Sequence, residues 1–163
     1  MVTLVFRRQE ILDDCRNYAY IEGDAISEDR PRERYRVMAI CDEGNIDRIS
    51  RLLDLSFAQI AELCYPYSKS PACNCCHQDN ELRDTQDYIL RIYVPEDFSC
   101  TTVQLLGKLF HELLVYKIMA DWLGMTLPEE MPKWQDKTDT LEKQVISILN
   151  SRICPVRRTL TPF

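Results

Sequence analysis

The sequence predicts a mainly α-helical protein with a small β-ribbon. Three stretches, residues 42–65, 99–124 and 127–152, carry apolar residues at the spacing of amphipathic helices. Residues 86–94 alternate between apolar and polar side chains, which predicts a strand. We therefore expect a helical bundle with a long antiparallel C-terminal helix pair and a protruding β-hairpin.

The length of 163 residues is typical of a single domain with one core, covering residues 1–163. The chain has only four glycines, which argues against a glycine-rich phosphate loop. No apolar run approaches the roughly 18 residues that a membrane span needs, so we expect no membrane partner. The N-terminus does not resemble a signal peptide, and we expect the protein to act in the cytosol or to be packaged from there.

The first forty residues, 1–40, give weaker signals. Residues 2–6 predict an edge strand, and residues 7–20 predict a short helix. The polar segment 23–34 predicts a surface loop. Residues 34–40 have strand-like content, although a short extended link into the next helix fits them equally well.

The helix over residues 42–65 has a clear apolar stripe. We expect Asp42 to cap its N-terminus and Pro66 to end it. The stripe consists of Ile46, Ile49, Leu53, Phe57, Ile60 and Cys64.

Residues 66–94 predict the hairpin. If residues 67–72 pair with residues 86–94, the cysteine-rich segment between them becomes its tip. A lone two-stranded ribbon is marginally stable in water, so we expect it to lean on a helix or on a neighbouring chain. Within residues 86–94, one face carries Tyr88, Leu90, Ile92 and Val94.

The helix over residues 99–124 has a wide apolar stripe. Ser99 or Thr101 is expected to cap it and Gly124 to end it. So wide a stripe predicts a central helix that is covered on more than one side. The stripe consists of Val103, Leu106, Leu109, Phe110, Leu113, Leu114, Ile118, Met119, Trp122 and Leu123.

The helix over residues 127–152 has a narrower seam. We expect Thr126 to cap it and Pro128 to lie in its first turn. The short connection predicts that the two helices are antiparallel neighbours, with Trp122 and Trp134 packed in the core near the closed end. The seam consists of Met131, Trp134, Thr138, Leu141, Val145 and Ile148.

One cluster has the donors of a zinc site. Cys73, Cys75, Cys76 and His77, with Cys64 upstream, offer thiols and an imidazole. Their spacing is not that of the usual paired zinc ligands, because adjacent ligands in an extended chain point apart and no second ligand pair follows. We therefore expect no bound metal and no cofactor.

Catalysis finds little support in the sequence. The two histidines, His77 and His111, lie in no recognisable nucleophile motif. His111 and Glu112 begin a zinc-protease pattern, but Val115 stands where its second histidine would be. The prediction is that the protein is not an enzyme and that His111 is a polar surface or interface residue.

Charge is unevenly distributed along the chain. The net charge of −6 and the isoelectric point near 5.0 argue against general nucleic-acid binding. The C-terminal tail, by contrast, carries Arg152, Arg157 and Arg158 and no acid. Such a tail suits docking onto an acidic neighbour, including another copy of the chain, although a solvated, frayed terminus explains it equally well.

The order of elements resembles a known family. A capped helix over 42–65, a variable hairpin, a Pro-Glu-Asp turn at 95–97 and a long helix bearing A-D-W-L-G at 120–124 are similar to the small head–tail connector (head-completion) proteins of tailed phages. The last helix and the V-R-R-T-L-T-P-F ending at 156–163 resemble forms from prophages of Bacteroides-type bacteria.

This resemblance implies a structural connector at the portal–tail junction of a phage or prophage particle. Copies of the chain would form a closed ring, of about a dozen in this family, with portal and tail proteins as partners. DNA would pass nearby without specific binding, and the protein would reside in the virion after assembly in the host bacterial cytoplasm. The resemblance implies that residues 66–94 and 152–163 make the contacts between subunits and with the portal. The contact residues that it implies are Tyr88, Arg91, Tyr93, Arg152, Arg157, Arg158 and Phe163.

Two other functions stay open at this point. One is a small cytosolic metal-binding or regulatory module that uses Cys64, Cys73, Cys75, Cys76 and His77. The other is an enzyme whose site has no sequence signature.

Overall fold

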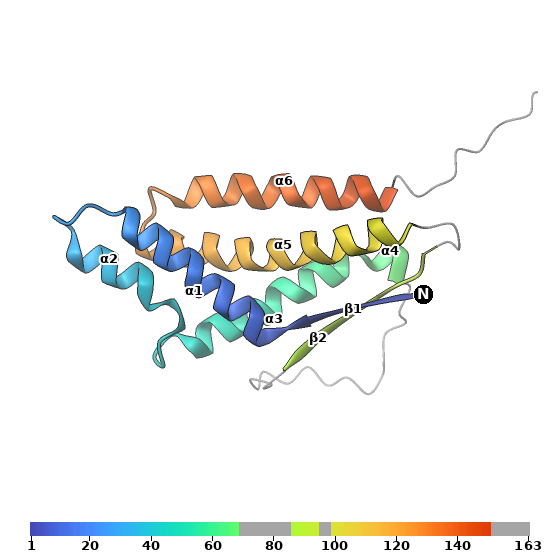
Figure 1. Cartoon of the computed structure of the whole chain (residues 1–163), viewed down its shortest axis with the longest axis horizontal. Helices are drawn as coiled ribbons and strands as arrows, with labels where there is room; N and C mark the ends of the chain where they lie inside the picture. The colour runs from blue at the N-terminus through green and yellow to red at the C-terminus, as the bar shows by residue number, and fades with distance from the viewer. Residues whose placement is uncertain (69–85, 95–98, 151–163) are drawn as a thin grey trace, which may run out of the picture.

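The computed structural model describes residues 1–68, 86–94 and 99–150. Within these residues the chain is mainly helical with one small sheet, as predicted (Figure 1). The elements are β1 (Val2–Arg7), α1 (Arg8–Ala25), α2 (Pro31–Met38), the 3-10 turn η1 (Ala39–Cys41), α3 (Ile46–Leu63), α4 (Tyr65–Ser68), β2 (Asp87–Ile92), α5 (Cys100–Thr126) and α6 (Met131–Asn150).

Helix α5 is the centre of the molecule. It contacts α1, α2, α3, α6 and β1 (Figure 1). Its wide apolar stripe explains this position, because each side of the helix needs a partner to exclude water. Its buried residues are Leu106, Phe110, Leu113, Leu114, Val115, Ile118, Met119, Ala120, Trp122 and Leu123. The predicted central role of this helix is confirmed.

Helix α6 lies antiparallel along α5, as predicted. The connection of residues 127–130 is too short for any other arrangement. Trp134, Thr138 and Val145 of the predicted seam are buried, and Leu141 and Ile148 are partly buried. Met131, at the start of the helix, is 38% exposed and lies outside the core.

The two tryptophans near this closed end are buried, but they pack against different partners. Trp122 donates a hydrogen bond from Nε1 to the carbonyl of Val37, at 2.9 Å. Trp134 contacts the rings of Tyr18 and Tyr116 edge-on, with centroid distances of 5.3 and 5.2 Å. Trp122 therefore anchors the α2–η1 segment, whereas Trp134 joins α6 to α1 and α5.

The small sheet differs from the expected local hairpin. Strand β2 pairs antiparallel with β1 at the N-terminus, in a register that places Val5 opposite Ile89 and Thr3 opposite Arg91. The expected pairing of residues 86–94 with 67–72 is wrong where it can be checked, because Tyr65–Ser68 form the helical turn α4. Residues 69–85, the expected hairpin tip, lie outside the described residues.

Helical structure extends further in the N-terminal region than the sequence suggested. Helix α1 continues to Ala25, and α2 begins at Pro31, so the predicted loop over 23–34 shrinks to the short link between them. Pro31 favours this start because a proline suits the first turn of a helix. Residues 34–40 are not extended, because helical geometry allows Val37 and Ile40 to be fully buried together.

Several predicted helix ends also shift. Helix α3 begins at Ile46, and Asp42 contributes only its backbone carbonyl to Asn45 and Ile46. Ser99 caps α5 as expected, its hydroxyl accepting from the Thr101 N–H at 3.2 Å. Helix α5 does not end at Gly124, and the Thr126 hydroxyl donates back to the carbonyl of Trp122 instead of capping α6.

The packing of α1 on α2 depends on Gly23. A Cβ at this position would lie 2.7 Å from Cγ of Met38 and 3.3 Å from the carbonyl oxygen of Arg34, so the two helices approach closely only because glycine has no side chain.

Across the described residues, no helix combines the length and the hydropathy required to cross a membrane.

Candidate functional site

The inner face of the ribbon belongs to the core. Phe6, Tyr88, Leu90 and Ile92 are buried, as the alternation along each strand requires. Phe6 contacts Phe110 of α5 edge-on, at a centroid distance of 6.4 Å, and Tyr88 contacts Phe57 of α3 at 5.0 Å. The ribbon therefore lies flat against two helices and does not protrude.

The outer face of the ribbon is exposed and largely apolar. The side chains of Met1, Val5, Ile89 and Tyr93 are between 50% and 68% exposed. Cross-strand pairing brings Val5 beside Ile89. We call this surface the ribbon face; it consists of Met1, Thr3, Val5, Ile89, Arg91 and Tyr93.

The strands beside this face also offer backbone hydrogen-bonding groups. In residues 1–68, 86–94 and 99–150, no third strand pairs with β1 or β2. An open strand edge next to exposed apolar side chains is a template for pairing with another chain. At one end the edge is occupied, because the Tyr93 N–H donates to the Tyr67 carbonyl at 2.9 Å.

The predicted contact residues divide into three groups. Arg91 and Tyr93 are exposed on the ribbon face, and their role in contacts stays a prediction. Tyr88 is only 5% exposed, so its assignment to an interface is wrong: the alternation turns it toward α3. Arg152, Arg157, Arg158 and Phe163 lie outside the described residues.

Tyr88 has a structural role that the sequence did not reveal. Its hydroxyl donates to Oδ1 of Asp54 on α3, at 2.5 Å. Burial raises the pKa of Tyr88, and the hydrogen bond to Asp54 and the negative charge of that carboxylate raise it further, against a smaller opposing effect of Arg8. The folded state therefore favours the neutral form of the Tyr88 phenol.

Stability should therefore fall in alkali. The pKa of Tyr88 is higher in the folded chain than in the unfolded one, so its contribution is intact below about pH 10 and is lost as the pH rises above that value. We expect the free energy of unfolding, measured with urea at a series of pH values, to decline above this point. The Tyr88→Phe variant should show a shallower decline, and an identical decline in both proteins would contradict this role.

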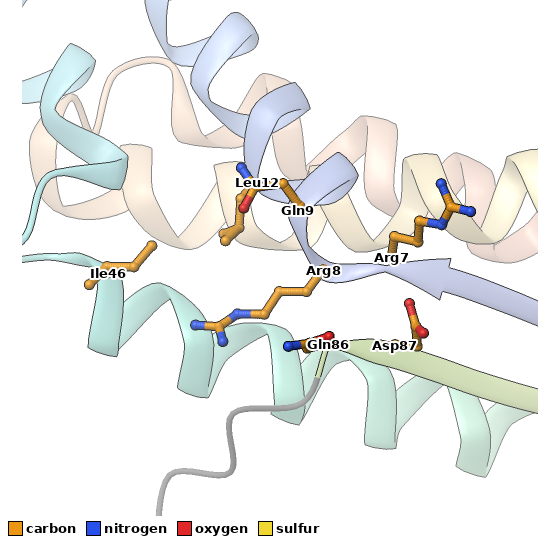
Figure 2. A pocket seen from close by; sticks show the side chains of 7 residues that line it. All are labelled: Arg7, Arg8, Gln9, Leu12, Ile46, Gln86 and Asp87. Atoms are coloured by element: carbon orange, nitrogen blue, oxygen red, sulfur yellow. The ribbon is translucent and has the colours of Figure 1, made fainter.

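A hollow lies at the junction of β1 and α1. It has a volume of about 590 Å³ and lies between the start of α1, the start of β2 and the start of α3 (Figure 2). The side chain of Arg8 crosses it toward α3, where Nη2 donates to Oγ of Ser50 at 2.5 Å. Ser50 in turn donates to the Ile46 carbonyl, so this arrangement ties the start of α1 to α3.

His111 makes an intramolecular contact. Its Nε2 lies 2.7 Å from Oδ2 of Asp14, which joins α5 to α1. One turn away, the Tyr18 hydroxyl donates to Oε2 of Glu112 at 3.4 Å. Cys15 is next to Asp14, but it is fully buried and burial raises the pKa of its thiol, so it is a poor nucleophile. The contact between His111 and Asp14 therefore serves to hold α5 and α1 together.

The metal-binding alternative gains no support from the described residues. Among them, no three histidine, cysteine or acidic side chains gather in a way that would hold a metal ion. Cys64 is buried at the end of α3, and Cys73, Cys75, Cys76 and His77 lie outside the described residues. The zinc cluster stays a hypothesis about those positions.

Comparison with protein-family models, with curated proteins and with solved structures finds no match to this chain.

Part of the ribbon face was missed from the sequence. Val5 and Ile89 are 84 positions apart, and only the pairing of β1 with β2 brings them together. The signal was present in residues 2–6, where Val5 falls on the face opposite Leu4 and Phe6. The missing information was the identity of the strand partner.

Proposed function

We propose that this protein is a structural connector that assembles into a closed ring at the portal–tail junction of a phage or prophage particle. The observation that carries the proposal is the ribbon face, where apolar side chains at least half exposed lie beside strand edges that no third strand among the described residues pairs with. Such a surface in a folded chain favours contact with another protein. The resemblance of the sequence to head–tail connectors supplies the setting.

The rest of the molecule is suited to such a role. A central helix covered by four others gives a rigid body, and a ring needs a rigid subunit because small angular errors accumulate around it. Arg91 lies within the ribbon face, opposite Thr3. It adds a directional, charged contact to a surface that is largely apolar.

The test is the oligomeric state of the full chain. We expect a closed oligomer at high protein concentration, seen by native mass spectrometry and by negative-stain electron microscopy. The double variant Val5→Lys/Ile89→Lys should remain monomeric, because lysines on the ribbon face cannot be buried without a partner. On dilute protein, where assembly does not add stability, its circular dichroism and unfolding transition should match those of the wild type.

The matched control is Leu55→Lys/Ile146→Lys, which makes the same chemical change at exposed positions of α3 and α6. This control should assemble normally. A wild-type chain that is monomeric at every concentration, or a ribbon-face variant that assembles like the control, would refute the proposal.

A further inference from the structure

Helix α2 carries a second distinctive surface, which the proposed function does not use. Four arginines alternate through the segment 30–36 of an otherwise acidic chain. Two of them have partners within the molecule: Arg30 lies 3.1 Å from Glu33, and Arg34 pairs with Asp24. The other two are Arg32 and Arg36.

Arg32 and Arg36 are exposed, and neither makes an ion pair or a hydrogen bond with any described residue. They are four positions apart and therefore lie on the same side of the helix. Like charges at this spacing repel and destabilise a helix slightly. An acidic partner bound to both would remove this repulsion.

Tyr35 stands beside them and is 70% exposed. Two hollows adjoin at this residue and at Arg36. One, of about 500 Å³, is lined by Pro31, Arg32, Tyr35 and Arg36. The other, of about 480 Å³, continues toward the end of α5 and is lined by Tyr35, Arg36, Ala39, Asp42, Asn45, Arg48, Trp122, Met125 and Thr126.

The two hollows together form one groove, and the side chains that line it differ between its two ends. At the α2 end its charges are both positive, from Arg32 and Arg36. At the α5 end it is lined by apolar Met125 and Trp122, and Arg48 there is already paired with Asp121 at 2.9 Å. The complementary ligand has acidic groups at one end and an apolar group at the other.

We propose that this groove binds an acidic segment of a partner protein, with two carboxylates on Arg32 and Arg36 and a flanking apolar side chain against Tyr35 and Met125. A peptide fits better than a nucleic acid. A phosphate backbone running along the groove would approach Asp42, and the chain as a whole carries a net charge of −6. The groove is on α2, at the end of the molecule opposite the N-terminus and away from the ribbon face, so it can be occupied independently of assembly (Figure 1).

The test is a selection of random twelve-residue peptides displayed against the immobilised full chain. We expect enriched peptides to carry an acidic pair next to an aromatic or aliphatic residue. A fluorescent copy of the most enriched peptide is then titrated by anisotropy. The Arg32→Glu/Arg36→Glu variant should bind it about tenfold more weakly, because both contacts become repulsive. A peptide with lysines in place of its acids should bind this variant better than the wild type.

The matched control is Arg51→Glu/Lys143→Glu, which changes the net charge equally at exposed positions on α3 and α6. It should bind the peptide like the wild type. Three outcomes overturn the proposal: no enrichment of acidic peptides, equal binding by both double variants, or displacement of the peptide by a single-stranded oligothymidine at lower concentration. Loss of self-assembly in Arg32→Glu/Arg36→Glu without peptide enrichment would assign the groove to a second copy instead.

Discussion

Replacing Trp134 with alanine is expected to lower the free energy of unfolding by about 3–5 kcal/mol. The ring is only 1% exposed and is held between Tyr18 of α1 and Tyr116 of α5. Lys137 lies over it, with Nζ 4.0 Å from the ring centroid. Its Nε1 has no hydrogen-bond partner among the described residues, so packing accounts for its contribution. Such a loss is a large part of the roughly 5–15 kcal/mol that stabilises a typical domain.

Urea unfolding followed by circular dichroism measures this effect. The control is Ile146→Ala on the same helix, where a side chain that is 40% exposed should cost far less. Equal losses in the two variants would mean that α6 is not packed through Trp134.

The second large effect separates two neighbouring residues of β2. Leu90→Ala should cost about 2–5 kcal/mol, since its side chain is 4% exposed and removing it leaves a cavity under the ribbon. Ile89→Ala should change stability by no more than about 0.5 kcal/mol, because its side chain is 50% exposed on the ribbon face.

Both variants are measured by urea unfolding on dilute protein, so that assembly does not add stability. A larger loss for Ile89→Ala than for Leu90→Ala would show that the strand is turned the other way. The ribbon face would then consist of different residues, and the proposed assembly surface would be wrong.

The candidate surfaces were only partly predictable. The resemblance implies Arg91 and Tyr93 as contact residues, and both are exposed in the structure. The resemblance implies Tyr88 as well, but Tyr88 is buried, because successive residues of a strand point to opposite faces of the sheet. The face of α2 is not predicted, because the composition of residues 23–34 favours a loop. The spacing of Arg32 and Arg36, after Pro31 and before the apolar Val37, was the signal that could have revealed it.

Local sequence pattern is sufficient to predict the three long helices. In α3, α5 and α6 the apolar positions recur every three or four residues, and this local pattern is enough to place each helix and its buried side. The cap at Ser99 was equally local. Because the connection at 127–130 is short, α5 and α6 must lie antiparallel beside each other.

The strand partner of β2 and the conformation of residues 34–40 depend on contacts between distant parts of the chain. Strand β2 could pair with a segment near it in sequence or with a distant one such as β1. The alternation of apolar and polar residues along β2 shows which side of the strand is buried, but it does not identify the strand that pairs with it. Likewise, Val37 and Ile40 are compatible with a strand or a helix until α1 and α5 provide a surface that buries both. Burial against partners remote in sequence outweighs local preference at both places.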